Sequence, residues 1–162
     1  MCSEVVEIEG GVLVDTRGGN ISVREVEGGV TAESAGGDIS IAEVEGGVIA
    51  HTAGGNLRLA EIDGGVKANT GGGNIELADI EGSVEATMGG GDITASEVDG
   101  GVEVSTGVGN IKVNEISGLV VGRTGVGDIE LNEVDGDAKV ETGIGTITLN
   151  EVSGKVEQHV GG

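Results

Sequence analysis

The sequence predicts an all-β chain, a parallel β-solenoid (β-helix) of nine coils with 18 residues each and two or three short strands per coil. Three observations lead to this prediction. One 18-residue unit repeats from end to end, apolar and polar residues alternate within it, and Gly recurs at fixed places while Pro, Phe, Tyr and Trp are absent. A period of this length is typical of solenoids, in which each coil buries its apolar side chains against its neighbours.

The repeat runs through residues 1–162 without insertions, as one repeat domain. A first Gly column recurs every 18 residues, at Gly10, Gly28, Gly46, Gly64, Gly82, Gly100, Gly118, Gly136 and Gly154. A second Gly lies nine residues after the first, from Gly19 to Gly145. We expect these glycines to form corners that need positive φ or close backbone approach.

Two alternating runs separate the corners. In the first full unit, the run 12–16 places Val, Val and Thr on one face, and the run 21–26 places Ile and Val on one face and ends in a last apolar residue. Period-two alternation indicates strands with one buried face. Recurrent Gly and β-branched residues disfavour helix. The inward Thr side chains are expected to pair their hydroxyls along the axis.

Asn or Asp follows the second Gly in most units, from Asn20 to Asp128. Stacked at one corner, these short side chains can form a ladder that accepts hydrogen bonds from corner amides. With coils about 4.8 Å apart, nine coils make a rod of roughly 43 Å.

The units have the pattern G-x-V-x-A-x-T-x-x-G-[ND]-I-x-L-x-x-V, which resembles the bacterial and archaeal adhesin family of Gly-rich β-solenoid repeats. The resemblance covers the whole chain. It implies a non-enzymatic domain of cell-surface type and therefore an extracellular or cell-surface location. The very regular period and the lack of divergent end segments depart from that family and are typical of a consensus-like or engineered repeat.

The formal net charge of −21, from 29 acidic and 8 basic residues, disfavours nucleic acid and anionic membranes as partners. No apolar run approaches the ~20 residues of a membrane helix, so membrane insertion is not expected. The start MCSEVVEIEG lacks the basic and apolar regions of a signal peptide, so the residues themselves leave the location unknown.

Two columns hold over half of the acids. One comprises Glu7, Glu25, Glu43, Glu61, Asp79, Glu97, Glu115, Glu133 and Glu151; the other, two residues on, comprises Glu9, Glu27, Glu45, Asp63, Glu81, Asp99 and Asp135. We expect both to point outward, where neighbours repel by roughly 0.9 kcal/mol in bulk water. Regularly spaced carboxylates suit Ca²⁺. A solvated edge that keeps rods from clumping is the simpler interpretation, because no chelating loop motif is present.

No catalytic, cofactor-binding or metal-binding residues are predicted, and the chain is interpreted as a non-enzyme. His51 and His159 share an outward column six coils apart, about 29 Å, which is too far to cooperate. Cys2 is the single cysteine, so it has no partner for an internal disulfide. It is an inert residue, a thiol that joins two rods, or the lipid-bearing first residue of a surface lipoprotein.

Neither end of the repeat gains Pro, an amphipathic helix or a run of Lys. The C-terminal Gly162 stops one position before the place in the unit where Met1 begins, so one molecule could continue into the next. Such a head-to-tail contact is open and generates filaments. We therefore expect a structural solenoid whose partner is itself. The alternative is a monomeric adhesin-type domain that contacts a surface ligand, or cations, through its outward columns.

Overall fold

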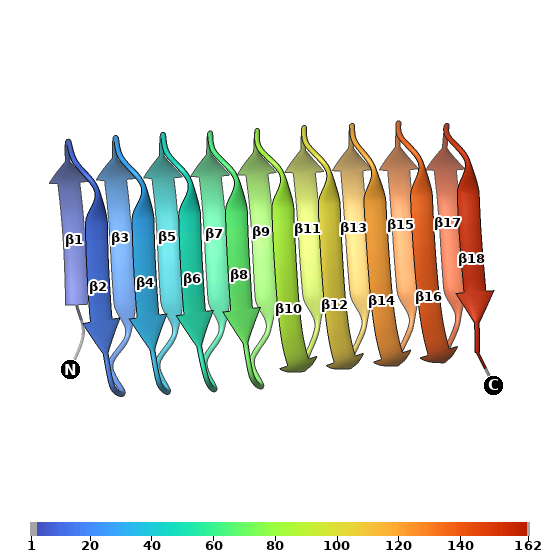
Figure 1. Cartoon of the computed structure of the whole chain (residues 1–162), viewed down its shortest axis with the longest axis horizontal. Helices are drawn as coiled ribbons and strands as arrows, with labels where there is room; N and C mark the ends of the chain where they lie inside the picture. The colour runs from blue at the N-terminus through green and yellow to red at the C-terminus, as the bar shows by residue number, and fades with distance from the viewer. Residues whose placement is uncertain (1–2, 162) are drawn as a thin grey trace.

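A computed structural model of the chain describes residues 3–161, which form a parallel β-solenoid of 18 strands and contain no helix (Figure 1). The strands are β1 (Ser3–Ile8), β2 (Val12–Thr16), β3 (Ile21–Val26), β4 (Val30–Ser34), β5 (Ile39–Val44), β6 (Val48–Thr52), β7 (Leu57–Ile62), β8 (Val66–Thr70), β9 (Ile75–Ile80), β10 (Val84–Gly90), β11 (Ile93–Val98), β12 (Val102–Val108), β13 (Ile111–Ile116), β14 (Val120–Val126), β15 (Ile129–Val134), β16 (Ala138–Ile144), β17 (Ile147–Val152) and β18 (Val156–Val160). The predicted fold class is confirmed, with two strands per coil.

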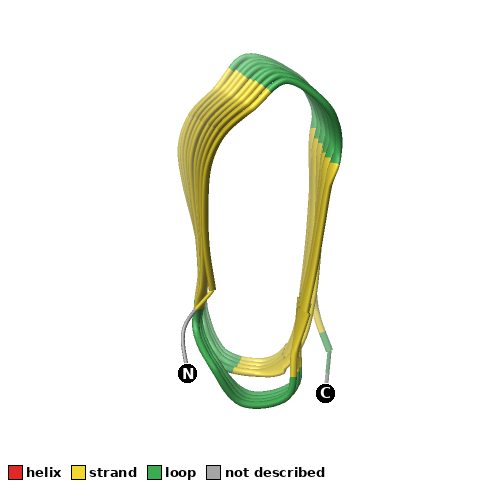
Figure 2. Cartoon of the chain, turned by 90° about the vertical axis from the view of Figure 1, so that its left-hand side faces the viewer, coloured by secondary structure: helices red, strands yellow, loops and turns green. Residues whose placement is uncertain are grey.

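The odd-numbered strands form one nine-stranded parallel sheet and the even-numbered strands form the other. Seen along the axis, each coil is a flattened loop with two long walls (Figure 2). A first corner, such as residues 9–11, leads from an odd to an even strand, and a second corner, such as residues 17–20, leads back. From the N-terminal end the chain turns clockwise as it recedes, so the solenoid is right-handed.

Each residue pairs with the residue 18 positions later, so identical columns stack. Ile39 pairs with Leu57 and Ile41 with Leu59, for example, and all four side chains are buried. The buried columns of the two walls meet in a thin aliphatic core. Because every coil repeats the same inward positions, the core needs no aromatic residue to fill it.

The odd strands contain one residue in the left-handed region. Nine acidic residues, from Glu7 to Glu151, have φ between 49° and 57°, and this column is skipped in the strand pairing. The conformation resets the alternation, so that Ile41 and Val44 both point inward although they are three residues apart. Glu rarely adopts this conformation, and the sequence analysis did not predict it.

The predicted close approach of glycines at the corners is confirmed. A Cβ at Gly28 would lie 2.7 Å from the carbonyl carbon of Gly10 in the coil below, which no side chain tolerates. Four glycines of the second corner, Gly91, Gly109, Gly127 and Gly145, have φ between 127° and 152°. The remaining glycines among residues 3–161 do not have positive φ.

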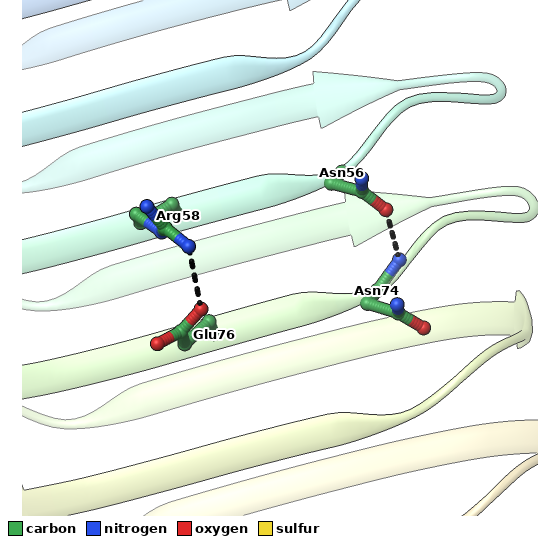
Figure 3. Close-up of polar contacts among 4 residues, drawn as sticks. All are labelled: Asn56, Arg58, Asn74 and Glu76. Atoms are coloured by element: carbon green, nitrogen blue, oxygen red, sulfur yellow. Dashed lines mark hydrogen bonds and ion pairs between the residues drawn. The ribbon is translucent and has the colours of Figure 1, made fainter.

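The Asn/Asp ladder is also confirmed. From Asp38 onward, the backbone N–H of each ladder residue donates to the side-chain oxygen one coil earlier, as from Asn74 to Oδ1 of Asn56 at 2.8 Å (Figure 3). The expected Thr ladder was wrong in its bonding. Thr52 is buried, but its hydroxyl donates to the carbonyl oxygen of Gly37 at 3.0 Å and not to another hydroxyl. The hydroxyl thus satisfies a corner carbonyl of the preceding coil.

Candidate interaction surfaces

The two acidic columns together form the acidic strip along the first corner and the end of the odd wall. All their side chains are exposed, and they flank buried residues such as Val26 and Val44, as the sequence predicted. A shallow trough between the columns is lined from Glu7 and Glu9 to Glu61 and Asp63. The left-handed backbone at the first column is what lets both columns face outward on either side of an inward residue.

Charges along the strip perturb one carboxyl group. The pKa of Glu97 is raised from 4.5, first because its protonated form can hydrogen-bond Asp79 in the preceding coil, and then because Asp79 and Glu115 are negative. Protonation of Glu97 therefore relieves repulsion between three successive coils. The effect is local, because the group is exposed and salt screens it.

Basic residues neutralise little of the strip. Four exposed ion pairs occur among residues 3–161, and only that of Arg24 with Glu43, at 3.8 Å, involves it. The pair of Arg58 and Glu76, at 3.3 Å, lies on the odd wall (Figure 3). Such exposed pairs contribute at most about 1 kcal/mol each.

Within the described residues, no three Asp, Glu, His or Cys side chains converge in a way that could hold a metal ion. The carboxylates instead follow one another along the axis. The solvated edge stays the prediction for these columns, and calcium binding stays its less favoured alternative. His51 and His159 are exposed on β6 and β18, and Cys2 lies outside the described residues, as do Met1 and Gly162.

A second trough, the apolar groove, lies where the first corner enters the even strands. It has a volume of about 1020 Å³ and extends over seven coils, from Gly11 to Val121. Its floor carries five glycines that follow the first Gly column: Gly11, Gly29, Gly47, Gly65 and Gly101. Its walls include the exposed side chains of Leu13 (78%) and Ile49 (51%), and the exposed Leu119 (51%) replaces the floor glycine in the seventh coil.

Sequence reasoning missed this groove. The second Gly of each EGG looked like part of a corner requirement, and outward Leu and Ile were few. The available signal was that Leu13 and Ile49 stand in a mostly polar outward column and that Leu119 replaces Gly in the neighbouring floor column.

The two ends of the rod expose strand edges. β1 and β2 lie at one end of the two sheets, and β17 and β18 lie at the other. Every residue of β18 is exposed, including its inward-facing Val156 (40%) and Val160 (54%). The corresponding positions in the even strands of the middle coils are buried. Within residues 3–161, core columns are thus exposed at the edge formed by β18.

Comparisons with models of protein families, with curated proteins and with solved structures found no match to this chain. Among residues 3–161 there is no helix long and apolar enough to cross a membrane.

Proposed function

We propose that this chain is a non-enzymatic structural β-solenoid that stacks end to end into rods or filaments. The observation that carries the proposal is the exposure of core columns at the edges of β17 and β18, where Val156 and Val160 have no coil above them in the described chain. A second copy presents the same columns at β1 and β2. Stacking would bury these side chains and pair the exposed backbone edges.

The strand register supports the contact. With β1 of a second copy placed over β17, Leu149 meets Val5 and Val152 meets Ile8 of that copy, as 18-residue spacing pairs them inside the chain. With β2 of the second copy over β18, Val156 meets Val12. The joint therefore continues both sheets without a change of side-chain face.

The acidic strip opposes stacking. The joint brings Glu151 next to Glu7 of the second copy, with the same repulsion as between coils, roughly 0.9 kcal/mol in bulk water before screening. We therefore expect low pH and divalent cations to favour assembly.

Sedimentation velocity of matched edge variants tests the proposal. Val156→Lys places a charge in the contacting column, and His159→Lys adds a similar charge to the outward face of the same strand. We expect wild type and His159→Lys to form large species with increasing concentration, and Val156→Lys to remain small. Equal sedimentation of the two variants would contradict end-to-end stacking.

The alternative, a monomeric adhesin-type binding domain, is favoured by a different observation, the apolar groove on the side of the rod. The extracellular location implied by the family resemblance belongs with that alternative. A binding role of the groove does not require the ends, so it is compatible with stacking.

A further inference from the structure

Most first corners contain two successive glycines, one from the first Gly column and then one floor glycine of the groove. The backbone does not need Gly equally at these two positions. In the first column, a Cβ at Gly46 or Gly64 would lie 2.7 or 2.6 Å from the carbonyl carbon one coil below. At the floor glycines Gly29, Gly47 and Gly65, an added Cβ would lie 3.3 to 3.4 Å from a carbonyl oxygen, a tight contact that a shift of a few tenths of an ångström relieves, and φ is not positive. Steric contact therefore demands Gly in the first Gly column, whereas at the floor position a side chain needs only a small shift of its neighbour.

The chain itself demonstrates this freedom. Ser83 and Leu119 take the place of the floor glycine inside the same groove, and Asp137 and Lys155 take its place in later coils. Gly at the other five positions forgoes side-chain packing and costs conformational entropy. Its effect is to keep the floor of the apolar groove bare.

The groove offers its occupant side chains and not a strand edge. The floor carbonyls of Gly29 and Gly47 already accept hydrogen bonds from Val12 and Val30 at 2.9 Å. A partner that adds as a β-strand would find these acceptors taken. A helix satisfies its own backbone groups and can lay an apolar face into such a groove.

Charge selects the kind of helix. In each of these coils, the second acidic residue of the strip lies two residues before the floor glycine, as Glu27 before Gly29 and Glu45 before Gly47. Glu85 and Glu103 stand in the groove wall, against one cation, Lys67. A cationic polar face beside an apolar face would match both surfaces.

We propose that the apolar groove binds a cationic amphipathic helix of a partner protein. Its apolar stripe lies on the glycine floor between Leu13, Ile49 and Leu119, and its Lys or Arg side chains face the acidic strip. Seven coils at about 4.8 Å span about 29 Å between the first and the last. A helix of about 19 residues covers that length.

The test uses a synthetic amphipathic peptide of Leu and Lys, about 18 residues long, with a scrambled peptide of the same composition as its control. Fluorescence anisotropy measures their affinity for the full chain and for Gly47→Leu/Gly65→Leu, which fills the groove. Gly54→Leu makes the same change at the second corner, where no atom lies within 4 Å of the added Cβ. Circular dichroism and thermal melting check that each variant folds. If the Leu pair unfolds, Gly47→Ser/Gly65→Ser copies Ser83.

We expect the groove-filling variant to bind the peptide at least tenfold more weakly, the Gly54→Leu variant to bind it as wild type does, and the scrambled peptide to bind weakly to all three. Equal affinity for wild type and the groove-filling variant, or for both peptides, would show attraction to the acidic strip alone and overturn the proposal. It would also be overturned if filling the groove, without peptide, lowered the sedimentation coefficient, since a second copy would then be the occupant.

Discussion

The second corner takes two forms along one rod. In the first four coils, even strands end at Thr or Ser, and the Gly amide three residues later donates to that hydroxyl, as from Gly55 to Thr52 at 3.3 Å. From β10 to β16 the even strands are seven residues long and continue into the corner, where Val108 pairs with Val126. Figure 2 shows the two paths separating at the lower end of the loop.

The change falls where the hydroxyl cap is lost. Coil four has the corner Gly71–Gly73 in the first form, whereas the similar Gly89–Gly91 takes the second form one coil later. In the later coil Met88 takes the place of Thr, and its thioether is only a weak hydrogen-bond acceptor for the corner amide. Beyond it, Val or Ile replaces Gly at 108, 126 and 144 and favours extended backbone. A hydroxyl cap and β propensity thus compete for the corner.

The most direct way to break this comparison is Gly107→Ala. In the second form the added Cβ would lie 2.6 Å from the carbonyl oxygen of Gly89. We expect a loss of about 2 kcal/mol or more of unfolding free energy in urea titrations, by overpacking. The first form holds Ala53 at the equivalent position, and Ala53→Gly should cost only about 0.5–1 kcal/mol. At Gly71, in the last coil of the first form, an added Cβ would already clash with the carbonyl oxygen of Ala53, so the tolerance belongs to the coils before it. Similar costs for both variants would show that the two forms do not differ sterically.

Removing the hydroxyl sharpens the comparison. Thr52 both donates to Gly37 and accepts from Gly55, whereas Thr124 donates to the carbonyl of Gly109 at 3.0 Å. Thr52→Val should therefore cost about 2 kcal/mol and Thr124→Val about 1 kcal/mol, measured by chemical denaturation. An equal or larger cost at Thr124 would refute the capping role in the first form.

The first corner should respond alike in the two halves of the rod, the half with the first form of the second corner and the half with the second form. Glu61 and Glu133, one in each half, both have φ of 53°. Asn tolerates this conformation better than Glu, so Glu61→Asn and Glu133→Asn should each stabilise the fold by about 1 kcal/mol. Glu45→Asn, outside the left-handed column, removes a similar charge without relieving the backbone. A gain at Glu45 as large as at Glu61 would assign the effect to charge alone.

The smallest expected effect depends on pH. Because the folded state raises the pKa of Glu97, it binds that proton more tightly than the unfolded state does. The unfolding free energy should therefore rise as pH falls through the raised pKa towards 4.5, and this gain should be lost as pH rises again. Urea titrations at several pH values should show a weaker dependence in Glu97→Gln than in Glu9→Gln, which lies near the end of the strip. Identical pH profiles would contradict the assignment.

Much of the fold followed from the repeat alone. The period set the coil, the alternation set the buried faces, and the Asn column predicted the corner ladder through Asn56 and Asn74. The left-handed acidic column escaped prediction because Glu has no preference for that conformation. The three-residue spacing of Ile41 and Val44 was its signal. The two corner forms and the apolar groove depend on competing contacts between coils, which one unit does not reveal.

The most direct test of end-to-end stacking is electron microscopy of the purified chain over a range of concentration and pH, with and without calcium. We expect filaments one solenoid wide, far longer than the roughly 43 Å of a single chain, with an axial repeat of about 4.8 Å that continues across the joints. Uniform rods of that single-chain length under every condition would contradict the account.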